Sequence, residues 1–192
     1  MTAAALEGKA EVVRLLLKRG ANPNVLRGSL TPLMLIALYR DTNLETVRAL
    51  IEGGTDLEIR DMHGETALIL ASRQGRTEFV RELINFGVNI HSSSSSSKTT
   101  PLMAAAGAGQ VSTVKVLLNA GARVNDLQSS GYSALMFASI RGNIEVVKLL
   151  IQAGADLSSK NADGNTALSL AKQAGHKEIV HYLKSLQRKG HQ

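Results

Sequence analysis

Histidine is the residue type in this chain best suited to metal binding or proton transfer, and the chain has five histidines among 192 residues. The closest pair, His176 and His181, is five residues apart and off a common helical face. No cysteine is present, and no nucleophile stands in a defined context with a spaced His and Asp. The segment 107–109 is Gly-Ala-Gly but lacks the strand and the Lys of a phosphate-binding loop. We therefore expect no metal, no cofactor and no enzyme activity.

The net charge of +6 invites comparison with nucleic-acid-binding proteins. The basic residues are not gathered in one run, because an acidic stretch within residues 56–65 separates the basic N-terminal part from the basic C-terminal tail. A diffuse positive surplus is more typical of a soluble surface than of a binding footprint. Nucleic-acid binding is thus the less favoured interpretation, and weak binding of acidic surfaces stays open as an alternative.

The sequence also bears on the compartment. No stretch approaches the roughly 20 consecutive apolar residues of a membrane-spanning helix, so we expect no membrane insertion. Residues 1–9 lack the hydrophobic region of a signal peptide. With no cysteine for disulfides, the sequence favours a reducing compartment, cytoplasmic or nuclear.

A three-residue tag punctuates the chain at intervals of 35, 34, 33 and 33 residues. Its copies are Thr31-Pro32-Leu33, Thr66-Ala67-Leu68, Thr100-Pro101-Leu102, Ser133-Ala134-Leu135 and Thr166-Ala167-Leu168. A second marker that begins with Gly runs in phase at 20, 54, 87, 121 and 154. Repetition at this period predicts one continuous stack of short units, each too small to bury its apolar face alone.

The unit that contains Thr66 shows how the local signals work. Thr66 is placed to cap a short helix over 67–73 by accepting an amide hydrogen bond, and Gly75 ends that helix. A second helix follows, with apolar residues at the spacing of one helical face, and Gly87 terminates it. The same second-helix position holds valine in all six units, namely Val13, Val47, Val80, Val114, Val147 and Val180.

Together, the tag, the Gly-Ala-Asp or Gly-Ala-Asn that follows the second helix, and the 33-residue period resemble the ankyrin repeat family. The resemblance covers nearly the whole chain and implies an all-α solenoid of helix-turn-helix units with hairpin-like tips. Its units are 1–23 (truncated), 24–57, 58–91, 92–125, 126–158 and 159–192, the last a C-terminal cap. One departure from the family concerns the residue after the tag. The family usually has His there, whereas this chain has Met34, Ile69, Met103, Met136 and Ser169, so we expect apolar packing instead.

The resemblance further implies a non-catalytic module that binds a protein or peptide along the concave face formed by the tips and first helices. Carried over position by position, the candidate contact residues are Arg27, Leu30, Leu38, Tyr39, Met62, His63, Arg73, Tyr132, Ile140, Arg141, Asn165 and Gln173. Tyr and Arg are favoured anchors because they are large and form hydrogen bonds. We expect replacement of Tyr39, Arg73, Tyr132 and Arg141 by Ala to weaken binding without changing stability.

Two segments depart from the repeat. The unit that begins at 24 has two extra residues between its helices, within 39–43, as a tolerated loop or a contact device. Residues 92–97 are six consecutive serines at a hairpin tip, and the Gly expected near position 98 is Lys98. Serine-rich segments are flexible, so we expect a mobile tip there.

The two ends differ as well. Lys172 and Lys184 replace small or apolar residues at stacking positions of the last unit, which indicates a true cap. The first unit shows no such change, so we expect either further units before it or self-association through that end. The array could also be the targeting or regulatory arm of a larger protein, such as an enzyme or a pathogen effector.

Overall fold

The structure, a computed structural model, describes residues 1–39 and 43–189. The first helices of the pairs are α1 (Thr2–Leu6), α3 (Pro32–Leu38), α5 (Ala67–Gln74), α7 (Pro101–Ala108), α9 (Ala134–Arg141) and α11 (Ala167–Gln173). The second helices are α2 (Ala10–Lys18), α4 (Leu44–Glu52), α6 (Thr77–Asn85), α8 (Val111–Asn119), α10 (Ile144–Gln152) and α12 (Lys177–Lys189). Each predicted unit contains one pair. The described residues form no strand beyond isolated bridges, so the all-α prediction is confirmed.

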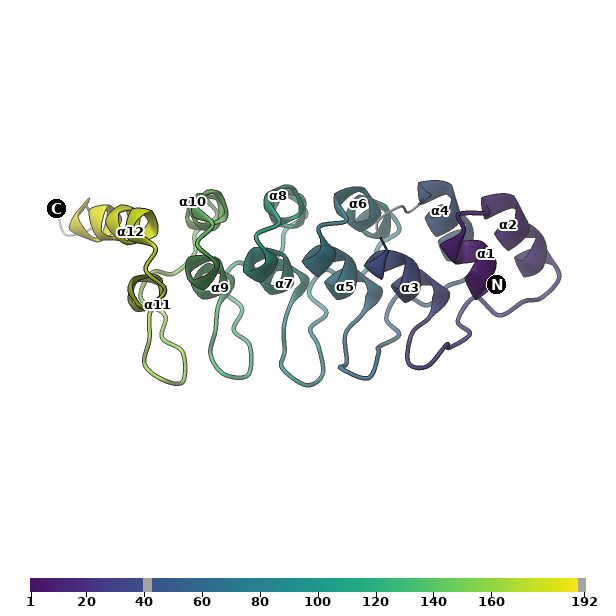
Figure 1. Ribbon diagram of the computed structural model, residues 1–192, viewed down its shortest axis with the longest axis horizontal. Coiled ribbons are helices and arrows are strands. Elements are labelled where there is room, and N and C mark those ends of the chain that lie inside the picture. Colours follow the sequence, from purple (N-terminus) through teal and green to yellow (C-terminus); the bar gives the residue numbers. More distant parts are fainter. Residues whose placement is uncertain (40–42, 190–192) are drawn as a thin grey trace.

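The pairs stack side by side into a solenoid with two helical layers (Figure 1). Each helix packs against its counterparts in the neighbouring pairs, and the hairpin tips project from the edge formed by the first helices (Figure 1). The extra residues of the loop between α3 and α4 fall largely on 40–42, which lie outside the described residues.

Four of the five tags cap their helices as predicted. The hydroxyls of Thr31, Thr100, Ser133 and Thr166 accept hydrogen bonds from backbone amides three residues on, at 3.2–3.3 Å. For Thr66 the prediction was wrong, because its hydroxyl is buried without a hydrogen-bond partner. Its backbone has the same extended conformation as the other caps, with φ −87° and ψ 166°. The difference therefore lies in the side-chain orientation.

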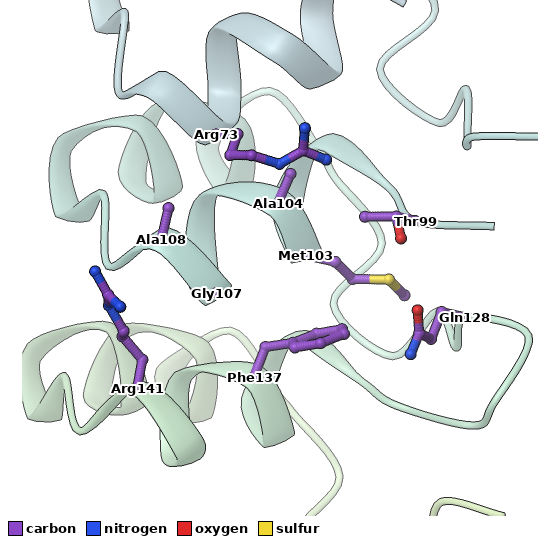
Figure 2. A pocket seen from close by; sticks show the side chains of 9 residues that line it. All are labelled: Arg73, Thr99, Met103, Ala104, Gly107, Ala108, Gln128, Phe137 and Arg141. Atoms are coloured by element: carbon purple, nitrogen blue, oxygen red, sulfur yellow. The ribbon is translucent and has the colours of Figure 1, made fainter. Parts of the chain in front are cut away.

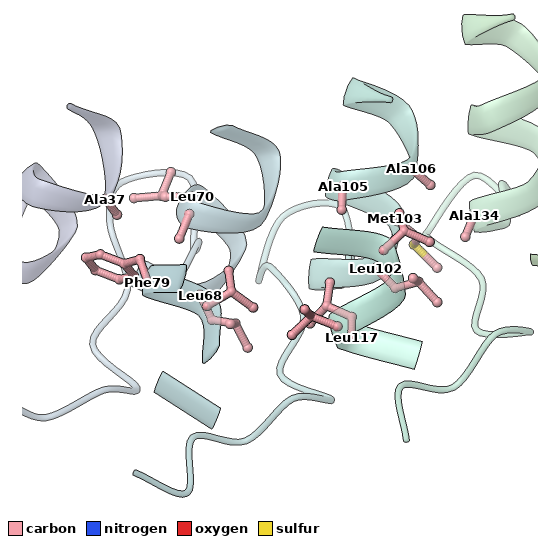
Figure 3. Close-up of a cluster of buried hydrophobic side chains, with 14 of the residues drawn as sticks. Ala37, Leu68, Leu70, Phe79, Leu102, Met103, Ala105, Ala106, Leu117 and Ala134 are labelled. Carbon is pink, nitrogen blue, oxygen red and sulfur yellow. The ribbon is translucent and has the colours of Figure 1, made fainter. Parts of the chain in front are cut away.

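The core runs along the whole stack and consists mainly of aliphatic side chains, many of them fully buried (Figure 3). At the position where the family usually has His, Met34, Ile69, Met103 and Met136 are at most 2% exposed. Apolar packing there is thus confirmed for these four. The fifth residue, Ser169, instead forms a capping box with Thr166. Burial of such side chains is the dominant stabilising contribution to a stack of this kind.

The outer faces of the first and last pairs differ in chemistry. Lys172 and Lys184 are exposed on the last pair, as expected of a polar end face. On the first pair, Val12 is 45% and Leu15 46% exposed. The position of Val12 is buried in every other unit, where it holds Thr46, Phe79, Thr113, Val146 and Ile179. The exposed side of α2 is therefore an apolar stacking face without a neighbour among the described residues.

The serine run forms a specific turn rather than an undefined one. The backbone amide of Ser94 donates to the carbonyl of Thr99, and Lys98 takes a positive φ of 57° in place of the expected Gly. The amide of Ser95 donates to the carbonyl of Gly64 in the preceding tip. Ser92 and Ser94 are buried. The conformation of this tip is thus set by hydrogen bonds to itself and its neighbour, and the mobility expected from the sequence stays a prediction.

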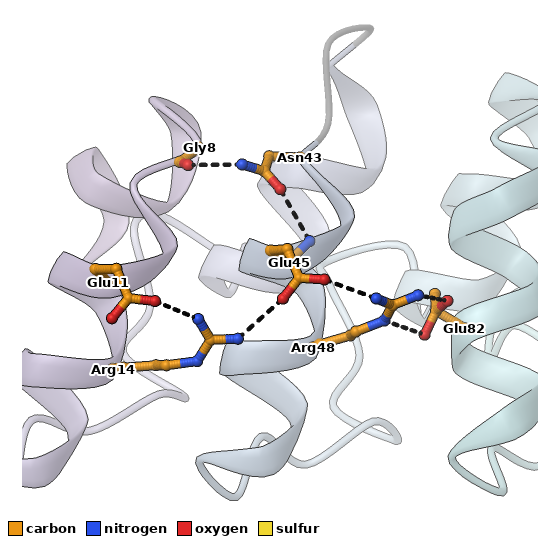
Figure 4. Close-up of polar contacts among 7 residues, drawn as sticks. All are labelled: Gly8, Glu11, Arg14, Asn43, Glu45, Arg48 and Glu82. Atoms are coloured by element: carbon orange, nitrogen blue, oxygen red, sulfur yellow. Dashed lines mark hydrogen bonds and ion pairs between the residues drawn. The ribbon is translucent and has the colours of Figure 1, made fainter.

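Charged side chains also link the second helices of the first three pairs (Figure 4). Arg14 pairs with Glu11 and Glu45, and Arg48 pairs with Glu45 and Glu82, at 2.6–3.1 Å. The hydrogen bond from Arg14, followed by that from Arg48, lowers the pKa of Glu45 below its usual value. The hydrogen bond from Arg48 and its positive charge likewise lower the pKa of Glu82.

Because a lowered carboxyl pKa favours the folded state only while the carboxyl is ionised, this stabilisation should disappear in acid. It is present above the usual glutamate pKa of about 4.3 and is lost as the pH falls through the lower folded value. We expect Glu82→Gln to lower the free energy of unfolding at pH 7, and the difference from wild type to vanish at pH values well below about 4. Urea titrations at several pH values measure this. Glu78→Gln, which removes an exposed pair within α6, is the control and should change little at any pH.

Candidate functional site

A groove opens on the side of the first helices and tips, where α5, α7 and α9 lie next to each other (Figure 2). Its volume is about 530 Å³, within the range of clefts that bind ligands or side chains of a partner. It is lined by Arg73, Thr99, Met103, Ala104, Gly107, Ala108, Gln128, Phe137 and Arg141. The side chains of α5 and α9 stand on opposite sides of α7, which forms the floor (Figure 2).

The groove exists because α7 has short side chains at the positions that line it. Ala104, Gly107 and Ala108 line the floor. Their counterparts are larger in the neighbouring helices, namely Leu70, Arg73 and Gln74 in α5 and Phe137, Ile140 and Arg141 in α9. The short side chains of α7 thus lie between the longer side chains of α5 and α9, and this difference in side-chain size produces the groove.

Phe137 forms the aromatic wall of the groove. Its ring stacks on Tyr132 with the centroids 5.4 Å apart and an interplanar angle of 28°. A Cβ added to Gly107 would lie 3.5 Å from the Cβ of Phe137, so the absence of a side chain at 107 leaves the space beside the aromatic residue open. Stacked aromatic rings hold each other in place, and Phe137 is therefore a fixed apolar surface.

The two arginines that line the groove are in different electrostatic states. Arg73 donates from Nη1 to Oε2 of Glu65 at 2.6 Å and from Nη2 to Oε1 of the same carboxylate. These hydrogen bonds raise the pKa of Arg73 above its usual value. Within residues 1–39 and 43–189, Arg141 makes no ion pair. The charge of Arg73 is thus matched inside the protein, and that of Arg141 is available to a ligand.

The structure places the other predicted contact residues along the same side of the array but outside the groove. Arg27 and Leu30 face each other across the tip before α3, and their backbones form an isolated bridge. Met62, which is 78% exposed, and His63 lie at the tip before α5. Leu38, at the end of α3, is half-buried. These residues are spread over two tips and a helix end, and they form no single cluster.

Four further predicted residues lie beside α3 or towards the last pair. Tyr39 directly follows α3 and is exposed, as is Ile140 on α9. Asn165 and Gln173 bind each other, because the Nε2 of Gln173 donates to the Oδ1 of Asn165 at 3.0 Å. Of the predicted set, only Arg73 and Arg141 line the groove, with Tyr132 directly behind Phe137.

Sequence reasoning missed Phe137, Met103, Thr99 and Gln128 as groove residues. The available signal was the run Ala104-Ala105-Ala106-Gly107-Ala108, five consecutive residues without a large side chain.

Other kinds of site find little support in the part of the chain that the structure describes. It contains no group of three or more His, Cys, Asp or Glu side chains able to hold a metal ion. None of its helices is both long and apolar enough to cross a membrane. Two further hollows lie at the ends of the array, and the one on the last pair is lined by Lys172, Lys177, His181 and Lys184.

The stacked helix pairs and the groove can now be compared with known proteins. A family profile described as "Ankyrin repeats (3 copies)" matches residues 1–94, 33–128, 86–161 and 102–191. The chain therefore belongs to the ankyrin repeat family. Ankyrin repeat domains typically mediate protein–protein interaction, and no catalytic function is indicated by this assignment.

Particular relatives extend the comparison. The crystal structure of the ankyrin repeat domain of Bcl-3, described as a unique member of the IkappaB protein family, superposes with a TM-score of 0.81 at 36% identity, covering 88% of this chain and 76% of that one. The mouse B-cell lymphoma 3 protein homolog is 35% identical over 129 residues, 65% of this chain and 28% of that protein. A putative ankyrin repeat-containing protein of Treponema pallidum is 32% identical over 99 residues, 52% of this chain and 33% of that protein.

A third curated relative is an enzyme. Glycerophosphocholine phosphodiesterase gde1 of Schizosaccharomyces pombe is 33% identical over 107 residues, 56% of this chain but 9% of the enzyme. The matches thus span a third or less of the lengths of these curated relatives.

Proposed function

We propose that this array holds a protein partner along its concave face, with the contact centred on the groove between α5, α7 and α9. The observation that carries the proposal is the groove itself. Its floor is formed by the short side chains of α7, one wall by the ring of Phe137, and Arg141 lines it without an ion pair in the described residues. Aromatic and arginine side chains in a recess are the residues most often dominant in binding energy. The scattered exposed residues of the tips, such as Met62 and His63, would contact the partner at the rim.

The experiment uses a variant that fills the groove with a residue the array already accepts. Ala104→Leu copies Leu70 of α5 and Leu170 of α11, which occupy the equivalent position, so the variant should fold normally. Wild-type protein is used to capture partners from a lysate of the source cell, with quantitative mass spectrometry as the readout. A partner bound through the groove should be depleted about tenfold or more by Ala104→Leu, the scale of one lost anchor contact.

Arg81→Ala is the matched control, since Arg81 is exposed on α6 and pairs only within that helix. It should leave capture unchanged. Loss of the same partner in Arg81→Ala but not in Ala104→Leu would move the binding surface to the second helices and contradict the proposal.

The array itself, in this proposal, performs no catalysis and works either alone or as the targeting arm of a larger protein such as an enzyme. Its similarity to a small part of gde1 supports the second arrangement. We also propose a protein rather than a nucleic acid as partner, and an intracellular location, cytoplasmic or nuclear, which the lack of cysteine supports. Salt titration of the bound partner separates the two partner classes, because neutralisation of phosphates makes affinity fall steeply with salt.

A second proposal is self-association through the exposed face of α2. Val12 and Leu15 are apolar and about half exposed there, whereas the counterparts of Val12 are buried in all other units. We expect the mass from light scattering to rise with protein concentration for the wild type, and Leu15→Lys to remain a monomer. Ile140→Lys, which alters a comparably exposed apolar residue on α9, should behave as wild type. A monomeric wild type over the whole concentration range contradicts self-association.

A further inference from the structure

The groove has a polar group at each end and an apolar middle. At the end nearer the hairpin tips lies Gln128, whose side-chain amide offers a donor and an acceptor. The middle is formed by Met103 and Phe137, and Arg141 stands at the opposite end (Figure 2). A ligand that fits must therefore be apolar in the centre, with an acceptor for a guanidinium at one end only.

Arg141 is exposed next to the turn at Gly109. A Cβ added to Gly109 would lie 3.8 Å from the Cγ of Arg141, so the glycine leaves the space beside the arginine side chain open. No carboxylate within the described residues pairs with the guanidinium. A guanidinium prefers a carboxylate or a phosphate, which it can bind with two parallel hydrogen bonds.

The state of Arg73, the other arginine of the groove, bears on whether a carboxylate or a phosphate fits better. The charge of Arg73 is compensated by Glu65, so the groove presents one free positive charge and, on the side of Arg73, a neutral pair. A phosphate carries about −1.5 to −2 charges and is usually held by several donors, whereas a carboxylate carries one. The single free charge of Arg141 therefore matches a carboxylate better than a phosphate.

From these observations, and resting on the proposed function, we infer that the groove recognises an extended peptide segment of the partner with a large apolar side chain followed or preceded by an acidic one. The apolar side chain fills the space over Ala104 and Gly107 and packs against Phe137. The Asp or Glu carboxylate binds Arg141, and Gln128 hydrogen-bonds the peptide backbone at the tip end. The positive net charge of the chain favours approach of such a segment.

Random peptides displayed on phage provide the probe. They are selected on the wild-type protein after depletion on Ala104→Leu, so that the enriched peptides are those that need the open groove. We expect the enriched sequences to share a large apolar residue and an Asp or Glu at a fixed distance from it. Synthetic versions should bind Arg141→Glu about threefold to tenfold more weakly than wild type, because an exposed ion pair is lost and replaced by repulsion. A peptide in which Lys replaces the acidic residue should bind Arg141→Glu better than wild type.

Controls separate this inference from the proposed function. Arg81→Glu makes the same charge change on α6 and should leave peptide affinity within about twofold, since distant exposed charges are screened. If Ala104→Leu abolishes binding but Arg141→Glu does not, the groove binds peptides and the acidic requirement is wrong. Failure of any peptide to be enriched, or enrichment of sequences without acidic residues, overturns the inference. If peptides are enriched but the cellular partner is lost only in Arg81→Ala, the peptide preference of the groove stands, whereas the proposed function fails and with it the assignment of the peptide to that partner.

Discussion

Gly64→Ala should lower the free energy of unfolding by about 2–4 kcal/mol, the largest effect we expect from a single methyl group in this chain. Gly64 has a φ of 73°, and a Cβ there would lie 2.5 Å from the backbone nitrogen of Ser95. That nitrogen donates to the carbonyl of Gly64 itself. Ala at position 64 would thus have to adopt a left-handed backbone conformation, and its methyl group would push the serine tip away from its neighbour. Chemical denaturation monitored by circular dichroism measures the change.

Gly164→Ala is the matched control, because Gly164 has a φ of 77° at the equivalent tip position but no atom within 4 Å of an added Cβ. Gly164→Ala should lower the free energy of unfolding by about 1–2 kcal/mol, the cost of a left-handed backbone conformation for Ala. The difference between the two variants isolates the contact with Ser95. Equal losses would mean that the serine tip is not seated on Gly64, and would favour the mobile tip expected from composition alone.

Arg73→Ala should lower the free energy of unfolding by about 2–3 kcal/mol, although Arg73 lies on the binding face. Its partner Glu65 has a side chain that is 10% exposed, and removal of the guanidinium would leave this carboxylate without its ion pair in a poorly hydrated place. The loss is below that of a fully buried pair because 40% of the Arg73 side chain is exposed. This result would replace the expectation from sequence that alanine here leaves stability unchanged.

Two comparisons check the origin of that effect. Arg141→Ala, on the same face but without an ion pair in the described part of the chain, should stay within about 0.5 kcal/mol of wild type. The double variant Arg73→Ala, Glu65→Gln should recover part of the loss, since it removes the unpaired charge. An Arg73→Ala variant as stable as Arg141→Ala contradicts a structural role for the pair.

The fold could be predicted from sequence because each helix pair repeats the same local signals. The tags at Thr31, Thr100, Ser133 and Thr166 cap helices by a mechanism that depends only on neighbouring residues. The valine column from Val13 to Val180 fixed the phase of the second helices. Lys172 and Lys184 could be assigned to the exposed end face, since charge is not buried without a partner.

The site was less predictable because it depends on how side chains from different units meet. The sequence indicates that Arg73 and Arg141 lie on the same side of the array. It does not show that Glu65 pairs with Arg73 and that Arg141 has no such partner among the described residues. Phe137 belongs to the groove because its ring lies beside the short side chains of α7 and stacks on Tyr132, and both contacts join separate parts of the chain. The groove depends on the contrast between α7 and both neighbours, so no single position reveals it. Likewise, Lys98 and the serine run form an ordered turn through contacts with the tip at Gly64.

The central claim is that a protein partner is bound in the concave groove, and hydrogen–deuterium exchange with and without that partner tests it most directly. The partner is the one captured by the wild-type protein and lost by Ala104→Leu. The account predicts slower exchange on binding in α7 and α9 and in the tip residues around Thr99 and Gln128, with α6, α8 and α10 unchanged. Protection confined to the second helices, with α7 and α9 exchanging as in the free protein, would contradict it.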